Sequence, residues 1–268
     1  MNGSTVTAID GALRLWFALT LGSLVLLVGD LARSSAITTV MKWGWALVVA
    51  YTGPVGLVAY LLSCREPLPR AHDAYVAPLW KQAVGSTIHC VAGDATGIIA
   101  GALIGAALVM PPRIDAIVEY VAGFAFGLFI FQALFMRVTM GVGYTAAIRR
   151  TLFPEWLSMN ALMGGMFPVM SILMRHDPTA MRPNGLRFWG VMSSAIMVGA
   201  VVAYPFNAWL VAHSLKHGMG TANVLGMGGG GIDPHQLKPH VTARSAAAAT
   251  IASWTVLAIG LWRAVRYG

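Results

Sequence analysis

Residues 86–110 read STIHCVAGDATGIIAGALIGAALVM, and this stretch decides the class of fold. It is largely apolar, has one Asp and no Lys, Arg or Glu, and exceeds the roughly 20 residues that a helix needs to cross a bilayer core. The composition of the whole chain indicates the same class of fold, because 57% of the 268 residues are hydrophobic and only 10% are charged. Soluble domains have about 25% charged residues. We expect an all-α fold, a polytopic membrane helix bundle.

Outward from this stretch, seven segments have the length and hydropathy of a transmembrane helix. They are approximately 11–30, 43–63, 83–110, 116–136, 155–175, 187–212 and 244–263. About seven transmembrane helices would put the two termini on opposite sides of the membrane. We expect residues 1–77 to form a two-span hairpin with an uncleaved first span, 78–220 a core of four spans, and 221–268 a glycine-rich loop plus a C-terminal span.

The net charge of +8 does not indicate a nucleic-acid partner in such a chain. Basic residues lie mostly at the ends of the expected spans, where they anchor helices against anionic headgroups. The lipid bilayer is the expected environment, and a multi-pass position in a bacterial inner (cytoplasmic) membrane is the expected location. The spans leave no room for a soluble catalytic domain, and the two cysteines cannot form a disulfide framework.

The stretch 86–110 also contains polar residues that are costly in lipid, since a central Asp costs about 2.5–3.5 kcal/mol. His89, Cys90 and Asp94 must therefore face protein or water. Cys90 and Asp94 are four residues apart and share a helix face, with His89 on its flank. Imidazole, thiolate and carboxylate together can bind a transition metal, so the three residues predict a metal site. Hydrogen bonding to neighbouring helices is the alternative.

Glycines recur at intervals of four in the same stretch. They are Gly93, Gly97, Gly101 and Gly105. A row of residues without side chains lets a second helix approach closely, and we expect it to serve helix packing.

The span 155–175 contains a row of methionines, spaced by 4, 3, 4 and 4 residues. They are Met159, Met163, Met166, Met170 and Met174. At 100° per residue, these five side chains and Glu155 fall within about 100° of the helix circumference. Thioether sulfur is a soft ligand that selects Cu(I), whereas methionine also fills gaps in apolar cores. The row predicts either a set of copper ligands or a packing face.

A third polar cluster follows the span 187–212, where His213 and His217 are four residues apart and Lys216 lies beside them. A helix continuing through both histidines would present them on one face, as in two-histidine metal sites. Met219 follows and begins a loop of low complexity, GMGTANVLGMGGGG at 218–231. The cluster predicts metal capture, with anchoring at the membrane interface as the alternative.

Several of these motifs, taken together and in order, resemble a bacterial membrane family of unknown function, DUF4396. The motifs are HCVAGD, SMNALMGGMFPVM, FWGVMSSAIMVGAVVAYPFNAWLV and KHGM, within about residues 78–220. The resemblance implies packed spans and a link to copper handling, and it supplies no reaction. Some members have a second cysteine where this chain has Asp94, which departs from a two-cysteine metal site.

Three functions are compatible with the sequence. The first is transport, delivery or binding of a transition metal, most simply Cu(I), through these Met, His and Cys residues, with a metallochaperone or a larger membrane complex as partner. The second is a redox subunit that binds haem or quinone among His89, His213 and His217. The third is an assembly or structural subunit without a ligand. The sequence does not decide whether the protein is an enzyme.

Overall fold

The computed structural model describes residues 3–34, 36–66, 72–141, 143–219 and 241–267. These residues form helices and no strands, which confirms the all-α fold. Six helices are long and apolar enough to cross a membrane. They are α1 (Gly3–Arg33), α5 (Leu79–Leu108), α8 (Tyr144–His176), α9 (Leu186–Ala212), α10 (Ala243–Tyr267) and the continuous helix made of α6 (Pro112–Ala125), the π-helical segment η1 (Phe126–Gln132) and α7 (Ala133–Met140). The glycine-rich loop 220–240 lies outside the described residues.

The second predicted span, 43–63, is not a single membrane-crossing helix. It is a hairpin of two short helices, α2 (Thr39–Thr52) and α3 (Pro54–Ser63). The rings of Trp45 and Tyr60 lie 5.3 Å apart, whereas one straight helix would separate these residues by about 22 Å at 1.5 Å per residue. The turn is at Gly53, whose φ of +56° suits glycine, and Pro54 lacks the amide hydrogen that a continuing helix would use.

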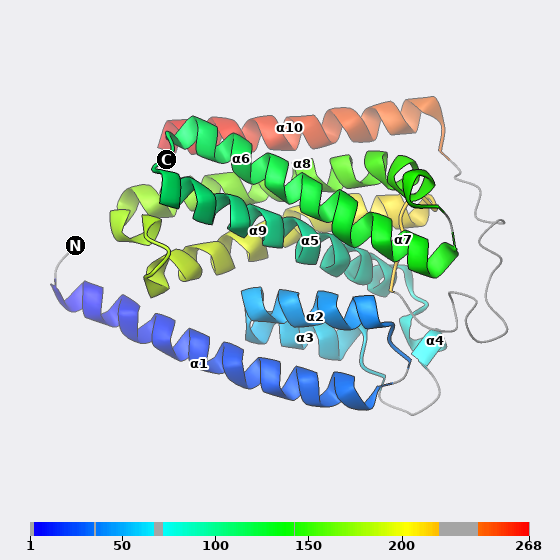
Figure 1. Ribbon diagram of the computed structural model, residues 1–268, viewed down its shortest axis with the longest axis horizontal. Coiled ribbons are helices and arrows are strands. Elements are labelled where there is room, and N and C mark those ends of the chain that lie inside the picture. Colours follow the sequence, from blue (N-terminus) through cyan, green and yellow to red (C-terminus); the bar gives the residue numbers. More distant parts are fainter. Residues whose placement is uncertain (1–2, 35, 67–71, 142, 220–240, 268) are drawn as a thin grey trace.

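The hairpin changes the topology that the sequence predicts. Its tip rests against the middle of α1, since a Cβ at Gly53 would lie 2.5 Å from Thr20 Oγ1, and the chain then returns to the end from which it came. Six crossings bring the start of α1 and the end of α10 to the same end of the bundle (Figure 1). The expectation of termini on opposite sides is therefore wrong.

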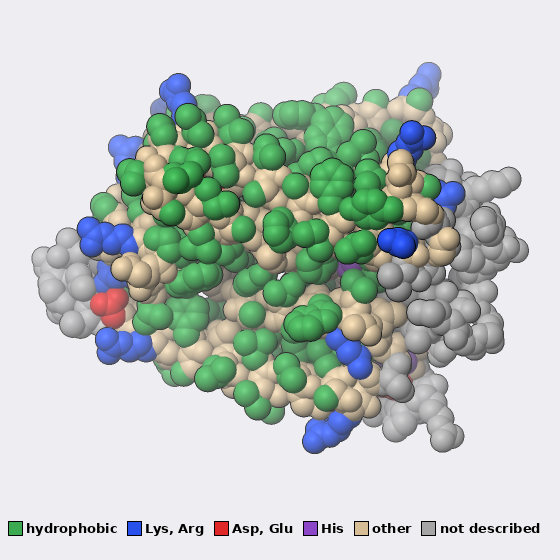
Figure 2. Space-filling view, in the orientation of Figure 1, with side chains coloured by type: hydrophobic (Ala, Val, Ile, Leu, Met, Phe, Trp, Pro, Cys, Tyr) green, Lys and Arg blue, Asp and Glu red, His purple; other side chains and the backbone are tan. Residues whose placement is uncertain are grey.

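The outer surface is that of a protein that lies in a bilayer. Figure 2 shows hydrophobic side chains over the middle of one face, with Lys and Arg gathered towards the two ends. Exposed apolar side chains are numerous on α1 and α10, the outermost helices; examples are Leu21, Val25, Ile251 and Val265. Interfacial Lys and Arg beside an apolar belt are typical of transmembrane bundles.

The glycine row of α5 packs against α6, as the spacing predicts. A Cβ at Gly97 would lie 2.3 Å from the carbonyl oxygen of Ala122, and a Cβ at Gly101 would lie 2.8 Å from Cα of Glu119. Gly93 likewise faces Gly127 of η1. Backbone approaches backbone at these three glycines, whereas Gly105 faces the Asp115 side chain. This backbone contact fixes where α6 and η1 lie relative to the polar residues of α5.

The remaining elements complete the core. Helix α8 begins at Tyr144, well before the predicted start of the fifth span at 155, and it packs against both α9 and α10. Two short elements, α4 (His72–Val76) and the 3-10 helix η2 (Pro178–Met181), lie in the connections. Because α8 lies between two neighbours and also contacts α5, its residues are among the most deeply buried.

Candidate metal centre

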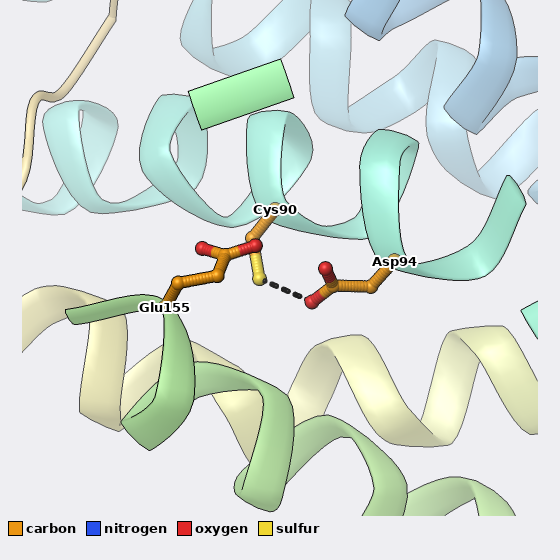
Figure 3. A group of neighbouring side chains, drawn as sticks. All are labelled: Cys90, Asp94 and Glu155. Carbon is orange, nitrogen blue, oxygen red and sulfur yellow. Dashed lines mark hydrogen bonds between the residues drawn. The ribbon is translucent and has the colours of Figure 1, made fainter. Parts of the chain in front are cut away.

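A thiol and two carboxyl groups meet between α5 and α8. Cys90 and Asp94 lie one turn apart on α5, Glu155 lies on α8, and all three side chains are fully buried. Their donor atoms lie within 4.8 Å of one another, and Cys90 Sγ donates a hydrogen bond to Asp94 Oδ2 at 2.9 Å. Figure 3 shows the three side chains turned towards one another from the two helices. One metal ion could contact all three.

Two oxygens of this group, Asp94 Oδ1 and Glu155 Oε1, are buried without a hydrogen-bond donor among the described residues, although the two carboxyl groups lie close enough to share a proton with each other. Both face Gly127 of the π-helical segment η1. A Cβ at Gly127 would lie 1.9 Å from Asp94 Oδ1 and 2.2 Å from Glu155 Oε1, so glycine alone leaves room for both. Buried polar atoms without partners are rare in folded proteins, and π-helical turns are frequent at functional sites. The residues therefore fit a bound cation.

A lysine reaches the same group from a third element. Lys216 follows α9, is itself buried, and places Nζ 3.1 Å from Glu155 Oε2 and 2.8 Å from Ser158 Oγ. Burial alone lowers the pKa of this lysine, but the neighbouring Cys90, Glu155 and Asp94 raise it more, so the net change is upward. Lys216 is therefore an ammonium ion that partly balances the acidic group.

His89 and His217 lie beside this centre, and both rings lie close to Phe135. The His89 ring is 4.6 Å from the Phe135 ring, and the His217 ring is 5.9 Å from it. Nε2 of each histidine is buried without a hydrogen-bond partner among the described residues. Burial lowers the pKa of His217 to about 4, which leaves its imidazole neutral at pH 7, the form that binds metals.

His213 and His217 do not share a helix face, so this part of the prediction is wrong. Helix α9 ends at Ala212, and Ser214 has a φ of +56° that turns the chain away from the helix axis. His213 stacks on Trp209 with ring centroids 4.6 Å apart. Met219 is buried against Gly85 of α5.

The methionine row of α8 faces the protein interior. Met159, Met163, Met166 and Met170 are buried members of the main apolar core. Met166 packs against Gly199 of α9. These contacts agree with the packing alternative, and metal binding by the sulfurs stays a prediction.

The predicted ligand set omitted two residues of the centre, Glu155 and Lys216. Glu155 shares the helix face of the methionine row, and that position is the signal that could have identified it. Lys216 follows an apolar span directly, where a long side chain can extend either outward to the interface or inward. Its direction depends on the turn at Ser214, which the sequence pattern does not reveal.

The part of the sequence that forms this centre matches the model of a protein family. Residues 79–216 match the domain of unknown function DUF4396, which is 138 of the 268 residues. The chain belongs to DUF4396. No curated protein and no solved structure matches the chain. The DUF4396 region runs from the start of α5 to Lys216, so it contains Cys90, Asp94 and Glu155 as well as the lysine that pairs with them.

Proposed function

We propose that this DUF4396 chain binds a transition-metal ion at Cys90, Asp94 and Glu155 and serves its transport or delivery across a bacterial cytoplasmic membrane. The observation that carries the proposal is the convergence of three buried donor groups within 4.8 Å, inside a bundle of membrane-spanning length. Ionisable groups inside spans are rare and often mark the path of an ion. A metallochaperone is the partner expected to supply or accept the ion.

Lys216 has a defined part in this proposal. Without the ion, its ammonium group occupies one side of Glu155 and reduces the cost of burying a carboxylate. A metal ion at the centre would supply the positive charge in its place, and the Cys90 thiol would release its proton to the solvent, since the thiolate is the form that binds metals. The metal ion and the Lys216 ammonium group then compete for Glu155, so metal binding favours the release of Lys216 from Glu155.

The donor set bears on which metal binds. One thiolate with two carboxylates is a mixed set, and both thiolate and carboxylate oxygen are ligands of Zn²⁺. Cu(I) prefers soft sulfur, and the methionines of α8 pack in the apolar core. Of these, Met159 places its Cε near Gly123, one turn before Gly127. The three donors thus favour a divalent ion of the zinc type, while the methionine row favours Cu(I).

Elemental analysis of the purified protein after equilibration with either metal tests the proposal. We expect about one ion per chain, lost in Cys90→Ala and in Glu155→Gln but retained in Cys64→Ala. The last variant is the matched control, because Cys64 is equally buried but lies at the end of α3. Lys216→Met removes the competing ammonium and is expected to increase metal retention.

Two results would overturn the proposal. One is wild-type protein without stoichiometric metal after equilibration with Cu(I) and Zn²⁺; the other is equal loss in the Cys90 and Cys64 variants. The visible spectrum of the same sample tests the haem alternative, since a bound haem gives a strong Soret band.

A further inference from the structure

A second, larger site lies away from the metal centre, towards the other end of the bundle. It is a cavity of about 1660 Å³ between α5, α6, α8 and α10, larger than the 300–1,000 Å³ of common ligand pockets. None of Cys90, Asp94 and Glu155 lines it. Its edge includes Ile117 and Val265, which are 62% and 81% exposed on the apolar outer surface. A ligand dissolved in the bilayer could therefore enter from the side.

The walls of this cavity are rich in aromatic groups. Tyr120, Trp156, Phe167 and Trp254 all line it. The rings of Trp156 and Trp254 meet edge to face at 5.7 Å, and the Tyr120 hydroxyl donates a 2.6 Å hydrogen bond to Asn160. That bond holds the Tyr120 ring in place, so the cavity presents fixed aromatic groups of the kind that attract organic cations.

The charged groups of the cavity are divided between its interior and its rim. Asp115 and Glu119, four residues apart on α6, are acidic, and Glu119 is only 4% exposed. The arginines that line the cavity are all exposed residues; they are Arg113, Arg175 and Arg182. The interior is therefore acidic, and the basic charge stays at the interface.

The Glu119 carboxyl group has no hydrogen bond or ion pair in the described part of the chain, and the charged group that lies near it, Asp115, is also acidic. Asp115 Oδ1 is also buried without a partner among the described residues. A buried carboxyl group costs free energy unless something pairs with it, and here the cavity is the space from which a partner can reach it. A cation inside the cavity would supply that partner.

We propose that this cavity binds lipophilic organic cations, such as quaternary ammonium or phosphonium compounds, with Glu119 in its carboxylate form as the counter-ion. The apolar and aromatic walls would hold the body of the ligand, and Asp115 would add to the negative potential. The size of the cavity and its apolar and aromatic walls suit an organic cation. This proposal is independent of the metal centre and of its test.

Equilibrium dialysis of the purified protein with radiolabelled tetraphenylphosphonium tests the proposal. We expect saturable binding of about one cation per chain, weakened about tenfold or more in Glu119→Gln. Asp73→Asn is the matched control, because it removes one acidic charge on α4, outside the cavity, and is expected to bind like the wild type. Tetraphenylborate, which has the same shape and the opposite charge, is expected not to displace the probe.

Trp254→Ala provides a second variant that leaves both acids in place. It is expected to weaken binding several-fold through the lost cation–π contact, with an unchanged size-exclusion profile. The proposal fails if no saturable binding is found, if Glu119→Gln binds like the wild type, or if tetraphenylborate competes equally. Either of the last two results would mean that the cavity accepts any apolar molecule, as a site filled by bilayer lipid would.

Discussion

Substituting Ala for Gly127 tests the candidate metal centre without removing any of its donors. The added Cβ would lie 1.9 Å from Asp94 Oδ1 and 2.2 Å from Glu155 Oε1, whereas Cβ atoms essentially never approach another heavy atom within 3.0 Å. The two oxygens must therefore retreat by about 3.0 − 1.9 = 1.1 Å and 3.0 − 2.2 = 0.8 Å. Metal–ligand distances are fixed to about 0.2 Å, so both carboxylates would lose contact with an ion held by Cys90.

The expected result is a metal affinity about 10–100-fold below that of the wild type, the usual effect of disturbing the support of a ligand. The cost in folding free energy is expected to be about 1–3 kcal/mol, as for other overpacked cores, because the atoms in the way are ends of side chains. A chelator competition titration measures the affinity, and thermal unfolding in detergent confirms that the variant is folded.

Gly29→Ala is the control, since a Cβ at Gly29 on α1 would meet nothing within 4 Å. It is expected to bind metal like the wild type. A folded Gly127→Ala variant that retains wild-type affinity would refute the reasoning, because it would show that the ion does not lie among these oxygens.

Two further predictions concern the fold. Gly97→Ala puts a Cβ 2.3 Å from a carbonyl oxygen of α6 and is expected to lower the free energy of unfolding by about 1–3 kcal/mol. The control is Gly22→Ala on α1, where the added Cβ meets nothing within 4 Å and little effect is expected. Thermal unfolding compares the two variants, and equal stabilities would contradict the close packing of α5 on α6. Burial raises the pKa of Asp177, but hydrogen bonds from Thr179 and Arg187 outweigh it and lower the pKa below the usual value. Such a carboxylate stabilises the protein above its unfolded-state pKa of about 4, and this contribution is lost as the pH falls through the lower folded-state pKa. Asp177→Asn is therefore expected to lower the melting temperature at pH 7, by a difference that shrinks as the pH falls below about 4. A pH-independent difference would argue against this ion pair.

The sequence predicts the helices of this protein well where the signal is local. Runs of apolar residues identified the six long helices, including most of α5, and the interval of four identified the glycine face that packs on α6. The helical period also predicted that Cys90 and Asp94 share a face, and that Glu155 lies on the face of the methionine row. Each of these predictions depends on residues within a few turns of one another, which a sequence displays directly.

The sequence was a poor guide where chain direction matters. Hydropathy counts apolar residues without regard to direction, so a hairpin and a single span of equal length give the same signal; Gly53 and Pro54 were the local sign of the turn. The pairing of Glu155 with Lys216 joins residues 61 positions apart. It depends on the end of α9 and on the positive φ of Ser214, so no spacing rule could have predicted it.

The packing of α8 limits how the metal centre could open. Gly164 of α8 is in close contact with Gly260 of α10, and Gly165 is in close contact with Gly199 of α9, so neighbouring backbones hold the helix on two sides. A sideways movement of α8 would break both contacts, and Glu155 is therefore held in place. Lys216, in contrast, lies on a non-helical segment and reaches the centre with a long side chain. If an ion enters, the lower-cost adjustment is for Lys216 to release Glu155 while the helices stay where they are.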